Sequence, residues 1–160
     1  MVHTRRELLS RSAQVAAQVA ALLASVGFLP GRAQAQAAPY PSAAFEAKNM
    51  ADVMKALGAG APVASKDVTV TGPDIAENGA VVPIGASTTL PGVKRLLLLV
   101  EKNPAVLSAM FDVSDSVEAN FSTLVKMGQS SNVYAVALMN DGKALFAQKE
   151  VKVTLGGCGG

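Results

Sequence analysis

The sequence has little of what most catalytic and metal sites are built from. It contains one histidine, His3, one cysteine, Cys158, and no tryptophan. His3 lies in the segment that we assign below to export, so the exported part of the chain has no histidine. This excludes catalytic triads and zinc sites built on histidine, Cys/His nucleophile pairs, Cys-x-x-Cys redox centres and c-type haem attachment. We therefore expect none of these sites in the exported part of the chain, which also shows no cofactor ligands.

The sequence also lacks a strong excess of either charge. Lysine and arginine number 14 and the acidic residues 12, which gives a net charge of +2. Residues 1–35 contribute +3 to that sum, so the rest of the chain carries −1. A nucleic-acid-binding domain needs a basic excess on one face. We expect no nucleic-acid partner.

The first 35 residues have the layout of a signal peptide. An arginine pair, Arg5-Arg6, is followed by 20 uncharged, alanine-rich residues between Arg11 and Arg32. The glutamines, serines and alanines make this stretch weakly apolar for a permanent membrane helix. Small residues two apart fit cleavage after Ala35, which we favour, or after Ala37. We expect no membrane attachment after cleavage.

The arginine pair, followed after one residue by two leucines, resembles the twin-arginine export signal. Such a signal implies a bacterial periplasmic protein exported already folded. An ordinary secretory signal with a chance arginine pair is the alternative. Twin-arginine cargo usually folds early to hold a cofactor or to carry a partner, and this chain has no cofactor ligands. We therefore expect a partner exported in complex with it.

The exported part begins with a linker and a helix. Residues 36–44 are small and include two prolines, which predicts a linker. Apolar residues then recur near helical spacing from Phe45 to Leu57, and Gly58-Ala59-Gly60 ends the pattern. The sequence predicts one helix over 45–57, at the start of a domain over 45–155.

The remainder reads as β-structure. Strands are predicted at residues 67–71, 80–82, 93–100, 108–113, 118–127, 131–139 and 145–155. The pair Asn78-Gly79 favours a type I′ hairpin turn. Short strands at this spacing behind one helix predict a mainly β fold, an immunoglobulin-like antiparallel β-sandwich.

Two of these strands do not alternate between apolar and polar residues. Residues 96–100 and 133–139 are almost continuously apolar, so both faces of each strand require burial. Either the helix covers the second face, or that face is a partner interface. Both explanations can hold together.

The last five residues carry the strongest functional signal. Cys158 is flanked by Gly156, Gly157, Gly159 and Gly160. Four glycines have no side chains with which to pack a core, so we expect a flexible arm that presents the thiol. No basic residue in the tail lowers the pKa of the thiol, so its activation must come from another protein. The arm predicts a covalent carrier whose substrate, attached to Cys158, is passed among enzymes. A frayed tail with an incidental cysteine is the other interpretation.

The ending Val151-Lys152-Val153-Thr154-Leu155 followed by Gly-Gly-Cys-Gly-Gly resembles the carboxyl end of the SoxY family, the sulfur-carrier subunits of the bacterial thiosulfate-oxidising Sox system. Two further segments support the resemblance: residues 76–83 (AENGAVVP) and residues 100–104 (VEKNP). The twin-arginine start agrees with it as well.

The resemblance implies a carrier that is not itself an enzyme, has no catalytic residue and binds no metal or other cofactor. It implies a heterodimer with a signal-less SoxZ subunit in the periplasm, with Cys158 as the covalent attachment point and the glycines as a swinging arm. A haem cytochrome would join thiosulfate to the cysteine, a dimanganese hydrolase would release sulfate, and a molybdenum sulfane dehydrogenase would oxidise the remaining sulfur. The competing hypothesis is a periplasmic structural or adhesion-type β-sandwich with an incidental cysteine tail.

Overall fold

A computed structural model describes residues 40–154 of the chain. The expected signal peptide (1–35), the first part of the expected linker and the arm with Cys158 lie outside the described residues. The described part has two helices, α2 (Ser42–Glu46) and α3 (Met50–Ala56), and nine strands. The strands are β1 (Pro62–Ala64), β2 (Val68–Thr71), β3 (Ile75–Ala76), β4 (Val82–Thr88), β5 (Val93–Val100), β6 (Leu107–Asp112), β7 (Asn120–Val125), β8 (Ser131–Met139) and β9 (Ala144–Val153).

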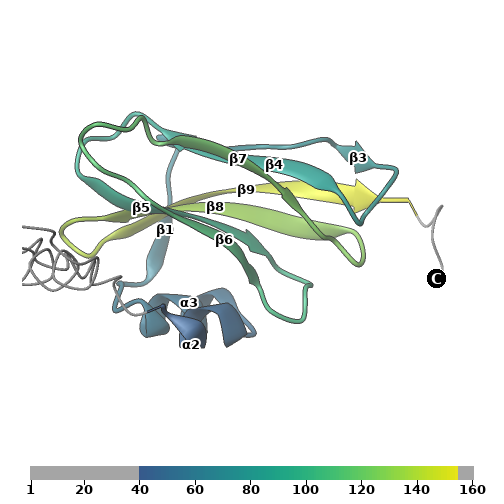
Figure 1. Ribbon diagram of the computed structural model, residues 1–160, viewed down its shortest axis with the longest axis horizontal. Helices are drawn as coiled ribbons and strands as arrows, with labels where there is room; N and C mark the ends of the chain where they lie inside the picture. Colours follow the sequence, from purple (N-terminus) through teal and green to yellow (C-terminus); the bar gives the residue numbers. More distant parts are fainter. Residues whose placement is uncertain (1–39, 155–160) are drawn as a thin grey trace, which may run out of the picture. The chain divides into compact units, whose positions relative to one another are not determined.

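The strands form two sheets that face each other (Figure 1). The larger sheet has the order β1-β9-β8-β5-β6, with β3 also paired to β9, and the smaller has the order β2-β4-β7. Most neighbours are antiparallel, whereas β1 and β3 run parallel to β9. The predicted mainly β, immunoglobulin-like sandwich is confirmed.

Strand β5 lies inside the larger sheet, between β8 and the edge strand β6, and its residues 96–100 are buried on both faces. Leu96, Leu98 and Val100 point into the core between the two sheets. Leu97 and Leu99 point the other way, into a second core under the helices, where they meet Val53 and Met54 among others. Burying a leucine side chain stabilises a fold by about 1.5–3 kcal/mol. The continuous apolar run of β5 is thus covered by this chain's own helices.

The helical region differs from the prediction. Instead of one helix over 45–57 there are two, and α2 begins at Ser42, inside the predicted linker. The break comes from Asn49, whose side-chain oxygen accepts a hydrogen bond from the backbone N–H of Asp52 at 2.9 Å and so caps α3. The unwound Ala47 carbonyl accepts from the N–H of Val106 at 3.1 Å. The predicted end is confirmed, because Gly58 follows α3 with a φ of +66°.

The predicted Asn78-Gly79 hairpin is wrong. Residues 75–76, its expected first arm, pair with the end of β9 and not with β4. The φ of Gly79 does not lie in the left-handed region that a type I′ turn requires. Elsewhere the predicted strands at 93–100 and 131–139 coincide with β5 and β8.

No helix within residues 40–154 is long and apolar enough to cross a membrane.

Candidate functional site: the root of the carboxyl-terminal arm

The end of β9 leads directly into the arm, and other parts of the chain hold it on both sides. Lys152 donates its backbone N–H to the carbonyl of Asp74 at 2.9 Å, and Thr154 donates to the carbonyl of Ala76 at 3.1 Å. On the other side, the N–H of Val153 donates to the hydroxyl oxygen of Ser130 at 2.9 Å. These bonds give the arm a fixed root, at the right-hand end of Figure 1.

The turn at Gly79 packs closely against this root. Met127 donates its backbone N–H to the Gly79 carbonyl at 2.7 Å. A Cβ atom at Gly79 would collide with the carbonyl oxygen of Met127 and lie 2.8 Å from Cγ1 of Val153. Glycine is therefore required here by close backbone approach.

An ion pair ties the segment before β3 to β9. The Lys149 ammonium lies 2.9 Å from Oδ1 of Asp74 and also donates to the carbonyl of Gly72 at 2.6 Å. The hydrogen bond from Lys149, and then its positive charge, lower the pKa of Asp74. Both ends of the pair are partly or largely open to solvent, so its contribution is positional more than energetic.

The described residues include neither a histidine nor a cysteine that could act as a nucleophile, base or metal ligand. The only histidine and the only cysteine of the sequence fall outside residues 40–154. Within that range, no three acidic side chains gather closely enough to hold a metal ion. Cys158, Gly156, Gly157, Gly159 and Gly160 also lie outside it, so their predicted roles remain predictions.

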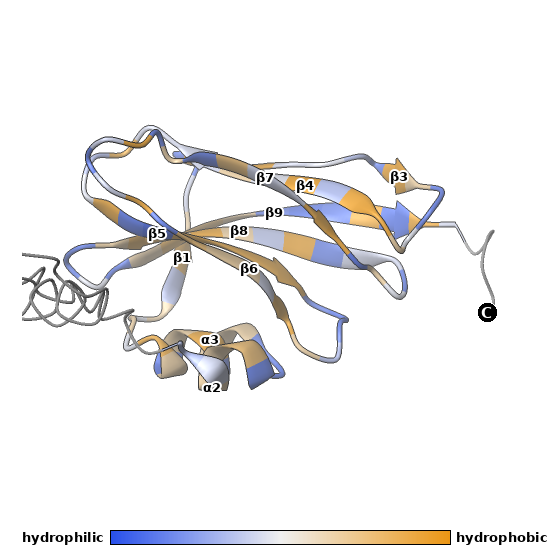
Figure 2. Cartoon of the chain, in the orientation of Figure 1, coloured by the Kyte–Doolittle hydropathy of each residue, from blue (hydrophilic) through white to orange (hydrophobic). Residues whose placement is uncertain are grey.

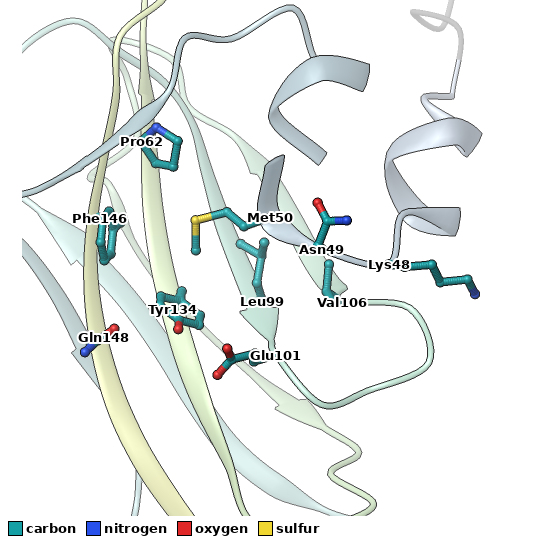
Figure 3. A pocket seen from close by; sticks show the side chains of 10 residues that line it. All are labelled: Lys48, Asn49, Met50, Pro62, Leu99, Glu101, Val106, Tyr134, Phe146 and Gln148. Atoms are coloured by element: carbon teal, nitrogen blue, oxygen red, sulfur yellow. The ribbon is translucent and has the colours of Figure 1, made fainter. Parts of the chain in front are cut away.

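A cavity of about 360 Å³ opens between the helices and the outer face of the larger sheet (Figure 3). Its walls are mostly apolar and include Met50, Leu99 and Phe146, while Glu101 and Gln148 bring polar groups. The Tyr134 ring lies in this cavity and tilts against Phe146, with 5.8 Å between the ring centres. Such a cavity can receive a side chain, but its lining offers no thiol or imidazole to carry a covalent group.

Burial, followed by the negative charge of nearby Glu101, raises the pKa of Tyr134. The phenol is therefore neutral at physiological pH and can only donate or accept a hydrogen bond. Glu101 in turn accepts from the side-chain amide of Asn132 at 2.9 Å.

Sequence reasoning missed the residues that fix the arm root. Asp74, Ser130 and Lys149 contact their partners across 23 to 77 positions of sequence. A two-residue strand such as β3 is too short to show a period-2 pattern. The nearest sequence signal was the glycine of the Asn78-Gly79 pair, which predicted a turn.

The family described as "Sulfur oxidation protein SoxY" matches residues 53–158 of the chain. The chain belongs to the SoxY family. The match begins in α3, runs through every strand of the sandwich and ends on Cys158.

A solved structure of a SoxY protein agrees with this assignment. The chain resembles the sulfur carrier protein SoxY from Chlorobium limicola f thiosulfatophilum with a TM-score of 0.58 and 30% identity, over 64% of this chain and 93% of that one. A superoxide reductase (neelaredoxin) from Ignicoccus hospitalis matches with a TM-score of 0.49 and 18% identity, over 54% of this chain and 80% of that one. A comparison with curated protein sequences gave no match.

Proposed function

We propose that this SoxY-family protein is a periplasmic sulfur carrier that holds thiosulfate-derived sulfur covalently on Cys158. One observation carries the proposal: the family match extends to Cys158, the only cysteine in the chain. The similar structure of the sulfur carrier protein SoxY from Chlorobium limicola supports the same role.

The proposed loading step is an oxidation. The Cys158 thiol and thiosulfate form a sulfur–sulfur bond, which gives a cysteine S-thiosulfonate, one proton and two electrons. A haem cytochrome takes the electrons. Water then attacks the terminal sulfonate sulfur, and sulfate leaves while a persulfide stays on the cysteine. The dimanganese hydrolase implied by the family resemblance performs this second step.

In this scheme the sandwich carries the arm and is bound by the partner enzymes, which perform each chemical step. This agrees with the composition, since no histidine follows residue 3 and no second thiol is present to activate Cys158. The fixed root at Thr154 defines where the arm leaves the sandwich. A molybdenum sulfane dehydrogenase would oxidise the persulfide sulfur, and a SoxZ subunit would pair with the sandwich.

The amino-terminal segment supports the proposed export of this protein together with a partner. A twin-arginine signal over residues 1–35 directs the folded pair to the periplasm, with the signal-less SoxZ subunit carried along.

Intact mass spectrometry tests the proposal. The carrier is purified without reductant from cells grown with thiosulfate, next to the Cys158→Ser variant from the same cells. We expect the wild-type protein to carry added sulfur or thiosulfate masses that fragmentation places on Cys158. The serine variant is expected to show none while it keeps the wild-type melting temperature and SoxZ pairing.

A wild-type protein that shows only a free thiol, or a random disulfide dimer, would favour a structural sandwich with an incidental tail. Thiosulfate-dependent cytochrome reduction at an unchanged rate with Cys158→Ser would equally rule out the carrier.

A further inference from the structure

The carrier must bring its cysteine into other proteins, and the length of the arm limits where those proteins touch it. Cys158 lies four positions after Thr154 in the sequence. At most about 3.3–3.6 Å is gained per residue, so the two Cα atoms lie within about 14 Å of each other in any conformation. An enzyme that holds the sulfur in its active site must therefore lie against the end of the sandwich where β9 ends.

The area buried by a weak interface also indicates which surface around the arm root an enzyme would contact. A transient contact buries up to about 600 Å² on each partner, which corresponds to a disc about 14 Å in radius. Such a disc centred on the arm root covers the turn at Gly79, the start of β4 and the end of β7. These segments meet at the arm root, because Gly79 contacts Met127 and approaches Val153.

Exposed apolar side chains gather at that end. Val81 directly precedes β4 and is 50% exposed, and Leu124 near the end of β7 is 64% exposed. Pro83, also exposed, lies directly opposite Leu124 in the pairing of β4 with β7. Figure 2 shows hydrophobic stretches at the start of β4 and the end of β7, close to where β9 ends. We call Val81, Pro83 and Leu124 the exit patch.

Two further features set this end apart. Ile75, 57% exposed, pairs with Lys152 beside the arm root and adds a fourth apolar side chain. The exit patch also continues into an uncharged surface. The exposed positions of the smaller sheet beyond it are Thr69, Thr71, Asn120 and Ser122. Contact with these strand positions desolvates no charged group, and a buried unpaired charge is costly. The exposed charged residues nearby, Glu77, Lys126 and Lys152, lie around the arm root at the rim of this surface.

We propose that the exit patch is the docking surface for the enzymes that load and unload Cys158, and that it receives apolar side chains around the entrance of a narrow active-site channel. The inference rests on the proposed function. Apolar contact at the centre of an interface, with charged residues depleted, is typical of such surfaces. Each enzyme that loads or unloads Cys158 must bind within reach of the same arm. The same patch therefore serves each of these enzymes.

The test introduces a charge into the patch and a matched charge elsewhere. Leu124→Asp and Val81→Asp are compared with Val117→Asp. Val117 is also an exposed apolar residue, 47% exposed, but lies in the loop between β6 and β7, at the opposite end of the sandwich. All are prepared as the full carrier with its partner subunit, and thiosulfate loading by the haem cytochrome is followed by intact mass.

We expect kcat/KM for the carrier to fall at least about tenfold with each exit-patch variant, through a higher KM, and to stay within twofold for Val117→Asp. Labelling of Cys158 by iodoacetamide, the melting temperature and partner pairing should stay unchanged in all three. These readouts separate docking from thiol chemistry and from folding. Leu124→Asn, which removes the apolar side chain without adding a charge, should give a smaller loss in the same direction.

Different failures have different meanings. Wild-type carrier that accepts no sulfur refutes the proposed function. Loading of wild-type and Leu124→Asp at equal rates leaves the carrier role standing and overturns the exit patch. Loss of the partner subunit from Leu124→Asp would overturn it too, by assigning this surface to subunit pairing.

Discussion

Thr154 donates its backbone N–H to the carbonyl oxygen of Ala76 at 3.1 Å, and the two residues lie 78 positions apart in the sequence. The last described residue before the arm is therefore positioned by a strand near the beginning of the sandwich. That strand, β3, runs parallel to β9 and continues into the turn that contains Gly79. The position at which the arm leaves the sandwich therefore depends on the contacts that fix β3 and the turn at Gly79.

Gly79→Ala should destabilise the sandwich by about 1–3 kcal/mol, because its Cβ has no room between the Met127 carbonyl and the Val153 side chain. Gly128→Ala is the matched control. Gly128 lies in the loop between β7 and β8, has no left-handed φ, and a Cβ added to it would meet nothing within 4 Å. Urea unfolding measures both. Equal free energies of unfolding for the two variants would show that the turn at Gly79 accommodates the added Cβ without loss of stability.

Asp74→Asn tests the ion pair beside the arm root. The pKa of Asp74 is lowered from its ordinary value of 3.8 in the folded protein, chiefly by the hydrogen bond from Lys149. A depressed pKa means that the carboxylate stabilises the fold fully above pH 3.8 and loses this effect as the pH falls through the folded-state value. The wild-type protein should melt slightly above the variant at pH 7, with the gap closing in acid.

Hydrogen exchange at the Lys152 amide, which is bonded to the Asp74 carbonyl, should quicken in Asp74→Asn. Asp141→Asn is the control, since Asp141 pairs with Lys143 at 2.7 Å in the turn between β8 and β9, at the other end of the sheet. If the Lys152 amide exchanged equally in both variants and in the wild type, the ion pair would have no part in holding the root.

Local patterns predicted the long strands well, because the signal lies within each strand. β5 and β8 are strands of eight and nine residues that contain the apolar runs 96–100 and 133–139, and their predicted limits match the structure. The single helix was wrong because apolar spacing continues through Asn49, while the capping bond from Asp52 to Asn49 decides the break.

The arm root and the exit patch were beyond sequence reasoning for a different reason. Ala76 meets Thr154, and Pro83 meets Leu124, only through the register of strands far apart in sequence. No periodicity within either segment records that pairing. The prediction of Cys158 as the attachment point needs no such pairing, because its glycine neighbours and its uniqueness are local features of the sequence.

Changing Arg5 and Arg6 to lysine should leave both this protein and its SoxZ partner in the cytoplasm. The export receptor recognises the arginine pair itself. Loss of the two guanidinium groups therefore abolishes recognition, although lysine keeps the positive charge. Cell fractionation and immunoblotting of both subunits measure the outcome. Arg11→Lys, in the same segment but outside the pair, should export normally. Continued export of the double variant would indicate the ordinary secretory route.

Valine in place of Gly157 or Gly159 should slow enzymatic loading and unloading at least about tenfold, equivalent to roughly 1.4 kcal/mol of barrier. A β-branched side chain next to Cys158 widens the arm and restricts its backbone, and both effects oppose entry into a narrow channel. Iodoacetamide, which needs no channel, should label the thiol at the wild-type rate in both variants. The comparison separates access from reactivity, because only the enzymes require the arm to be thin. Wild-type turnover by both valine variants would mean that the glycines act only as a spacer, and the channel would have no part in recognising the carrier.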